Sequence, residues 1–140
     1  MKVPLLASLK AGLLAGLAAA LINAVLFFFF RAAGVITDSV LLPDYRPLTV
    51  VPVILSSLIP ALLGSVAYYL LVRFTRDGYR YFTIIAVILL ILSFGNPFLG
   101  IPNVTVPYAL ALNVMHVVVA AALLYALRKF AGPAPDPIKP

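Results

Sequence analysis

The stretch LLASLKAGLLAGLAAALINAVLFFFF, residues 5–30, decides the fold, because it is long, apolar and carries Lys10 as its only charge. A helix needs about 20 apolar residues to cross the hydrocarbon core, with a lower limit near 17. Three similar stretches follow, at about residues 48–72, 81–95 and 105–127. The third of the four stretches is the shortest and reaches the required length only with its interfacial ends. The sequence therefore predicts an all-α protein, an integral membrane antiparallel four-helix bundle.

The composition supports this class, since hydrophobic residues make up 64% of the chain and charged residues 10%. A soluble domain carries about 25% charged residues. We expect one bundle domain over residues 1–131, with the first stretch retained as a helix, and a Pro-rich cytoplasmic tail over residues 132–140. The absence of cysteine excludes disulfides and thiolate sites. The net charge of +6 is explained by a membrane orientation better than by nucleic acid, which we do not expect as a partner.

Orientation follows from the distribution of basic residues. Four spans place both termini on one side, and eight of the ten Lys and Arg residues lie on that side. The other side has only Arg31 and Arg46. The positive-inside rule therefore predicts cytoplasmic termini in a multi-pass protein of the cell (inner) membrane. Tyrosines near the span ends, including Tyr68 and Tyr108, are predicted to form interfacial aromatic belts.

Small residues repeat every fourth position along the first stretch, including a GxxxG motif. Such a ridge lets another helix approach closely, so that dispersion contacts hold the pair together. We expect the ridge to form a helix seam inside the bundle, and a homodimer or a larger membrane complex is the alternative use. The predicted helix-packing residues are Gly12, Gly16 and Ala20.

Polar residues within the spans fall at one depth. Counted from the cytoplasmic charges at 1.5 Å per residue, they lie about 18–24 Å into the membrane. Pro60 should kink the second helix and free the carbonyl of Ser56 at the same depth. A shared depth is needed if these groups meet in one layer, in the outer half of the bundle. The candidate ligand-binding residues are His116, Asn113, Asn23, Ser93, Ser57 and Ser56.

His116 is the only histidine and the only titratable side chain deep in a span. It could bind a ligand, take part in a proton-linked step, or be a neutral imidazole hydrogen-bonded, directly or through water, to Asn113, Ser93 or Asn23. For the asparagines the structural alternative is interhelical bonding, and for the serines it is bonding to their own helix. His116 could also be an axial haem ligand, with Met115 as a second ligand, but the chain has no second histidine and no haem attachment motif, and no carboxylate lies in a span to bind a metal. We therefore expect no cofactor.

No catalytic constellation is visible, since the spans hold serines and one histidine but no acid. The apolar segment 96–104 should lie at the outer interface, or fold over the polar layer as a lid.

The chain resembles a bacterial family of small four-helix membrane proteins of unknown function. The resemblance rests on Asn23 in the first helix, the Gly64 region, Ser93, and the run Asn113-Val114-Met115-His116-Val117-Val118. It implies that Asn23 and His116 belong to a shared polar core, and it implies no activity. More distantly, the size and layout resemble four-helix bacterial membrane proteins of the DoxX type.

Three functions stay open at this point. The first is a bundle that binds a lipid, quinone or other amphipathic small molecule in its polar layer. The second is a structural or accessory subunit that docks a larger membrane complex through its small-residue ridges. The third is a membrane enzyme that uses His116 as acid or base. The confinement of the polar groups to one depth favours the first.

Overall fold

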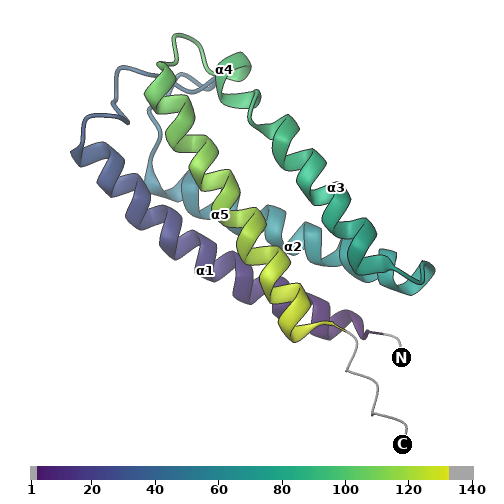
Figure 1. Ribbon diagram of the computed structural model, residues 1–140. Helices are drawn as coiled ribbons and strands as arrows, with labels where there is room; N and C mark the ends of the chain where they lie inside the picture. The colour runs from purple at the N-terminus through teal and green to yellow at the C-terminus, as the bar shows by residue number, and fades with distance from the viewer. Residues whose placement is uncertain (1–2, 133–140) are drawn as a thin grey trace, which may run out of the picture.

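The computed structural model describes residues 3–132, which fold into four long helices and one short helix (Figure 1). Within this range no β-strand forms, and only an isolated bridge joins Leu41 to Pro47. The Pro-rich tail was predicted over residues 132–140, and positions 133–140 of it lie outside the described residues. The helices are α1 (Leu5–Ala32), α2 (Val50–Phe74), α3 (Gly78–Ser93), α4 (Asn96–Gly100) and α5 (Val106–Phe130).

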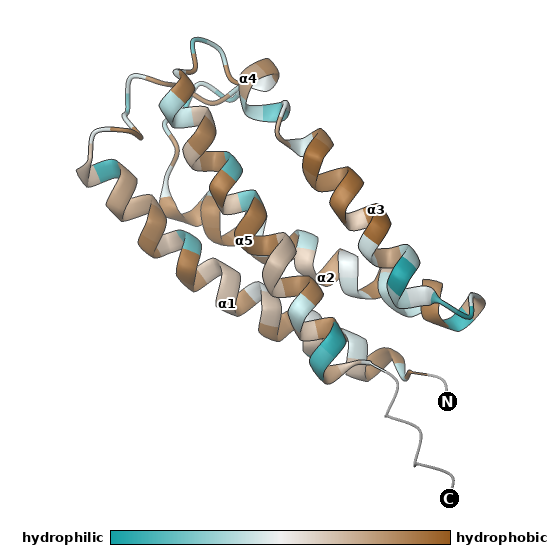
Figure 2. Cartoon of the chain, in the orientation of Figure 1, coloured by the Kyte–Doolittle hydropathy of each residue, from teal (hydrophilic) through white to brown (hydrophobic). Residues whose placement is uncertain are grey.

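Four segments are long and apolar enough to cross a membrane, namely α1, α2, α5 and the stretch Gly78–Gly100 that joins α3 to α4. Large apolar side chains point outward along them, such as Leu21, Leu63 and Leu92, which are each more than 60% exposed. Figure 2 shows that hydrophobic residues predominate along the helices, with the most hydrophilic residues gathered mainly toward the helix ends. The predicted fold class is confirmed, and the chain is a multi-pass membrane protein.

The helix ends follow local chemistry. Thr105 caps α5, as its hydroxyl accepts a hydrogen bond from the amide of Tyr108 at 3.4 Å. Phe94 and Gly95 interrupt the third span between α3 and α4, and Pro97 lies in the first turn of α4, where its missing amide hydrogen breaks no helix hydrogen bond. The segment after that interruption is not a simple loop, since α4 forms over its first five residues. Phe98 and Leu99 of α4 are exposed, which favours the interfacial alternative over a lid.

The small-residue ridge of α1 lies against α2. A Cβ atom added to Gly12 would lie 2.5 Å from Ser65 Cβ, and one added to Gly16 would lie 3.1–3.3 Å from Leu58 and Ala61. Ala20 is also buried. Without these side chains the two backbones come close enough for extensive dispersion contact. This face of α1 is therefore occupied within the chain itself.

The long helices do not pack equally. α1 has its main contacts with α2 and α5, and it makes none with α3. α3 packs through its first turns, where Gly78 and Phe82 are buried, and its second half buries no residue. In Figure 1 this second half of α3 runs apart from α1, with α5 between them in the view. The core that positions a site is thus formed by α1, α2 and α5.

The loop between α1 and α2, residues 33–49, covers one end of this core. We call this end of the bundle the loop end. Ile36, Val40 and Leu48 of the loop are buried against the ends of the helices. Arg31 donates two hydrogen bonds of 2.8 Å to Asp38, and these bonds hold the pKa of that carboxyl below its ordinary value. The loop is therefore a packed element of the bundle.

Two apolar clusters fill the interior. One cluster lies toward the α2–α3 turn and contains Ala15, Ala61 and Leu123, while the other lies at the loop end around Phe27 and Tyr108. Along every core helix, the residues between these clusters include polar ones. Of the predicted polar layer, Asn23, Ser57 and His116 thus lie at the boundary between the two apolar clusters.

Candidate functional site

Asn23 joins the three core helices. Its side chain is 2% exposed, and its Nδ2 donates to Ser57 Oγ at 3.0 Å and to the Met115 carbonyl at 3.1 Å. Ser57 Oγ in turn donates to the Val53 carbonyl at 2.9 Å, so that it accepts from Asn23. A carbonyl oxygen can only accept, and this fixes the orientation of the Asn23 amide. The contact connects α1, α2 and α5 at one depth.

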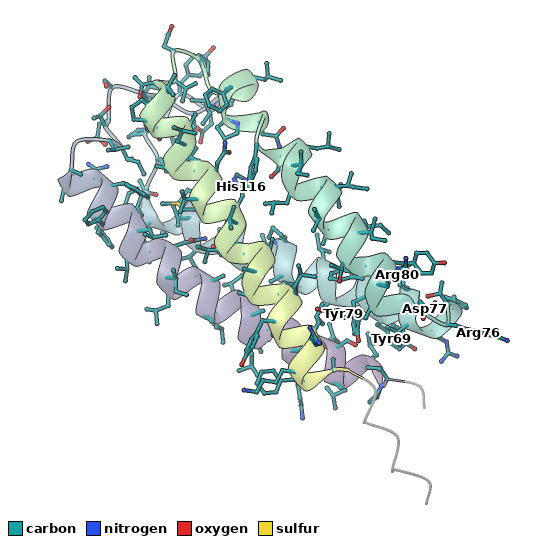
Figure 3. All side chains as sticks on the ribbon, in the orientation of Figure 1. Tyr69, Arg76, Asp77, Tyr79, Arg80 and His116 are labelled. Carbon is teal, nitrogen blue, oxygen red and sulfur yellow. The ribbon has the colours of Figure 1, made fainter. Side chains whose placement is uncertain are left out.

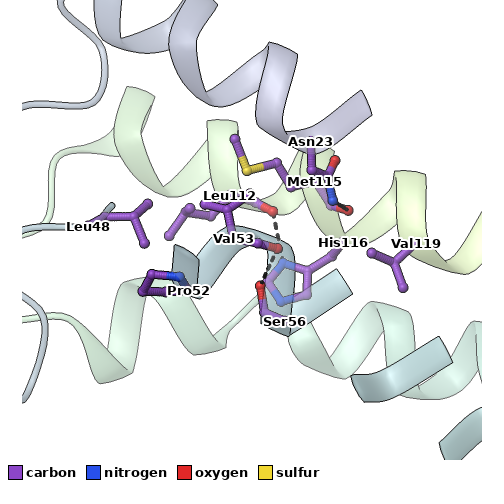
Figure 4. Close-up of a pocket in the computed structure, with 9 residues that line it drawn as sticks. All are labelled: Asn23, Leu48, Pro52, Val53, Ser56, Leu112, Met115, His116 and Val119. Atoms are coloured by element: carbon purple, nitrogen blue, oxygen red, sulfur yellow. Dashed lines mark hydrogen bonds between the residues drawn. The ribbon is translucent and has the colours of Figure 1, made fainter. Parts of the chain in front are cut away.

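A cavity of about 230 Å³ lies beside this junction and is partly open to the outside (Figure 4). Its polar lining consists of Asn23, Ser56 and His116, one from each core helix. It extends from the loop end to the middle of the bundle. Its apolar lining consists of Leu48, Pro52, Val53, Leu112, Met115 and Val119.

His116 is half-buried and hydrogen-bonded to its own helix, since its Nδ1 lies 2.8 Å from the Leu112 carbonyl. Within residues 3–132 no direct hydrogen bond joins it to Asn23, Asn113 or Ser93, which differs from the direct form of the prediction. The carbonyl four residues earlier lies one turn away on the same helix face. Because that carbonyl can only accept, Nδ1 carries a proton, and Nε2 of the neutral ring is an acceptor.

Figure 3 labels His116 in the middle of the bundle, far from the labelled charges at the α2–α3 turn. Figure 4 shows its ring beside Ser56, on the same cavity wall. Ser56 Oγ donates to the Val53 carbonyl at 3.1 Å, which matches the expected bonding of a serine to its own helix.

Two predicted site residues lie elsewhere. Ser93 Oγ donates to the Leu90 carbonyl at 2.7 Å, and Asn113 Nδ2 donates to the Phe94 carbonyl at 3.2 Å. Asn113 thereby pairs with a carbonyl oxygen at the end of α3. The last carbonyls of a helix have no amide partner within the helix. Neither residue lines the cavity. The structure thus places three of the six candidates on the cavity and Ser57 behind it.

Several buried polar atoms have no partner among the described residues. They are Ser8 Oγ, Asn23 Oδ1, Asn113 Oδ1 and the Tyr108 hydroxyl. Leaving such an atom unpaired costs about 1–3 kcal/mol. Tyr108 and Tyr68 are both fully buried, so their assignment to lipid-facing belts was wrong. The sequence signal for Tyr108 was its position near the first turn of a span, which suits a belt and a core equally well.

The lining of the cavity combines six apolar side chains with three polar ones. None of the nine residues around the cavity is acidic, so His116 has no carboxylate there to orient it as a general base. Within residues 3–132, no three His, Asp or Glu side chains gather where they could hold a metal ion. The apolar residues of the wall were missed from the sequence, although Leu112, Met115 and Val119 share the helix face of His116.

Comparison with known proteins gives one finding. A family model described as "Family of unknown function (DUF6069)" matches residues 6–133, which is nearly the whole chain. No curated protein and no solved structure matches the chain. The more distant likeness to DoxX-type proteins stays a prediction.

Proposed function

We propose a function from the chain's own site, since the chain belongs to the DUF6069 family, whose function is unknown. The protein binds the polar head of an amphipathic small molecule in the cavity between α1, α2 and α5. The observation that carries this proposal is the meeting of Asn23, Ser56 and His116 on one partly open cavity within a membrane bundle. Placing polar side chains at this depth of a membrane costs free energy, and such side chains usually face the bundle interior or a cavity and mark a functional site.

The size and lining of the cavity support a head group as the occupant. Pockets that enclose a drug-sized ligand have volumes of about 300–1,000 Å³. At about 230 Å³ the cavity admits a small polar head and the first part of a chain. The six apolar lining residues suit that chain, and the rest of it would lie in the surrounding lipid.

The two alternatives receive less support. An accessory subunit would dock through its small-residue ridge, and Gly12 and Gly16 are already covered by α2. An enzyme using His116 would need a second catalytic group, and the other polar lining residues, Asn23 and Ser56, are neutral.

Blocking the cavity tests the proposal. In Val119→Phe the larger ring enters the cavity, while Val117→Phe makes the same change on a side chain that is 42% exposed. Mass spectrometry of protein purified in mild detergent should detect a retained amphiphile in the unmodified chain and in Val117→Phe. Val119→Phe should retain on the order of a tenth as much, by analogy with the cost of losing about 1.4 kcal/mol of binding. Equal retention by Val119→Phe, or no retained molecule in the unmodified chain, would contradict the proposal.

We also propose that both termini face the cytoplasm in the inner membrane. Support comes from the basic residues, because Arg76 and Arg80 gather with Asp77 at the α2–α3 turn (Figure 3), and Lys10, Arg128 and Lys129 share that end. The loop end has only Arg31 and Arg46. Cytoplasmic loops carry such an excess. The cavity then opens nearer the outer face.

The chain has no cysteine, so single cysteines report orientation directly. We expect an impermeant thiol reagent added to intact cells to label Ser39→Cys in the α1–α2 loop and to leave Asp77→Cys unlabelled. Permeabilised cells provide the control, in which both positions react. The reverse pattern in intact cells would refute the proposed orientation.

A further inference from the structure

We infer that the occupant of the cavity is a neutral amphiphile whose head donates a hydrogen bond through a hydroxyl group. This inference rests on the proposed function and adds the chemical class of the ligand. It follows from the hydrogen bonds of the lining residues, because their side-chain donors are used within the protein while acceptors are left over.

Both amide hydrogens of Asn23 are used within the protein. Its Nδ2 hydrogens go to Ser57 Oγ and the Met115 carbonyl, and the amide cannot be reversed without placing two acceptors face to face. Asn23 Oδ1 has no partner. This oxygen is enclosed, so a ligand in the cavity does not reach it, and Asn23 offers the ligand no donor.

His116 has one acceptor to offer. Its Nδ1 proton is held by the Leu112 carbonyl at 2.8 Å, which leaves Nε2 without a hydrogen in the neutral ring. No hydrogen bond to Nε2 exists among the described residues. Nε2 therefore needs a donor from the contents of the cavity.

The rest of the lining supplies no competing donor. Ser56 gives its hydroxyl hydrogen to the Val53 carbonyl and keeps lone pairs to accept with. Pro52, in the first turn of α2, has no amide hydrogen. The other lining side chains are apolar. A ligand head that can only accept, such as a ketone, an ether or a quinone, would meet acceptors alone.

The charge of the ligand is set by the same lining. An ammonium group also donates, but burying it without an acidic partner costs more than its hydrogen bonds return. None of the nine lining residues is acidic. An uncharged hydroxyl satisfies His116 Nε2 or Ser56 Oγ without that cost. Long-chain alcohols, mono- and diacylglycerols, and quinols carry such a hydroxyl group and belong to this class of ligand. Quinones carry none and do not belong to it.

The test uses four probes that share one long alkyl chain: the primary alcohol, its methyl ether, the methyl ketone and the primary amine. Binding to the full chain in lipid nanodiscs is measured by calorimetry, with protein-free nanodiscs to subtract partitioning into lipid. The alcohol should bind about tenfold more tightly than the other three probes. A tenfold difference is expected when the alcohol makes one hydrogen bond to the cavity that the other probes do not make. Val119→Phe should weaken the binding about tenfold, and Val117→Phe should leave it unchanged.

The outcomes separate the two proposals. If all four probes bind equally and Val119→Phe weakens that binding, the cavity binds amphiphiles and the hydroxyl inference is overturned. Tightest binding of the ketone, the ether or the amine would overturn it as well. If no probe binds better to the unmodified chain than to Val119→Phe, the proposed function itself fails.

Discussion

Gly12→Ala is expected to lower the free energy of unfolding by about 1–3 kcal/mol, because one added methyl group has no room in the α1–α2 seam. The new Cβ would lie 2.5 Å from Ser65 Cβ and 2.9 Å from the Ala61 carbonyl oxygen. Neither neighbour is the free end of a flexible side chain, so the helix backbones must move apart. The loss is measured by equilibrium unfolding in mixed detergent micelles.

Two other glycines form a graded series with Gly12. A Cβ at Gly16 would lie 3.1–3.3 Å from Leu58 and Ala61, so Gly16→Ala should cost less than Gly12→Ala. At Gly100 nothing lies within 4 Å, so Gly100→Ala should leave the stability unchanged and is the matched control. Equal stability of all three variants would show that α1 and α2 do not approach as closely as described.

Much of this fold could be predicted from the sequence, because span length and small-residue spacing are one-dimensional signals. The ridge through Gly12 and Gly16 indicated close approach without naming the partner helix. The structure identifies that partner as α2, whose Ala61 and Ser65 are also small and buried. The short helix α4 was not predicted, since the five residues Asn96–Gly100 are too few to carry a periodic signal of their own.

The depth of the candidate site residues along the helices could be predicted, but their hydrogen-bond partners could not. Counting residues fixes the height of a side chain along the helix axis, and Asn23 and Ser57 do meet at a common height. It does not fix which neighbours a helix has. Asn113 bonds to the Phe94 carbonyl at the end of α3, and Ser93 bonds to its own helix. Hydrogen bonds within one helix, such as that of His116 to Leu112, need no neighbour at all.

The second large effect concerns the position of one proton. The chain contains a single histidine, so labelling with ¹⁵N-histidine gives signals from His116 alone. Because Nδ1 donates to the Leu112 carbonyl, we expect Nδ1 to be protonated and Nε2 to be bare in the unliganded protein. A bare and a protonated ring nitrogen differ strongly in their ¹⁵N chemical shifts, so the two states are told apart without any mutation.

The most direct test of the account is therefore ¹⁵N NMR of His116 in lipid nanodiscs at neutral pH, before and after adding the long-chain alcohol or its methyl ether. The account predicts a protonated Nδ1 throughout, and a bare Nε2 whose signal shifts when the alcohol is added and stays in place with the ether. A proton on Nε2 in the unliganded protein, or an equal response to both probes, would contradict the claim that this cavity binds a ligand that donates a hydrogen bond.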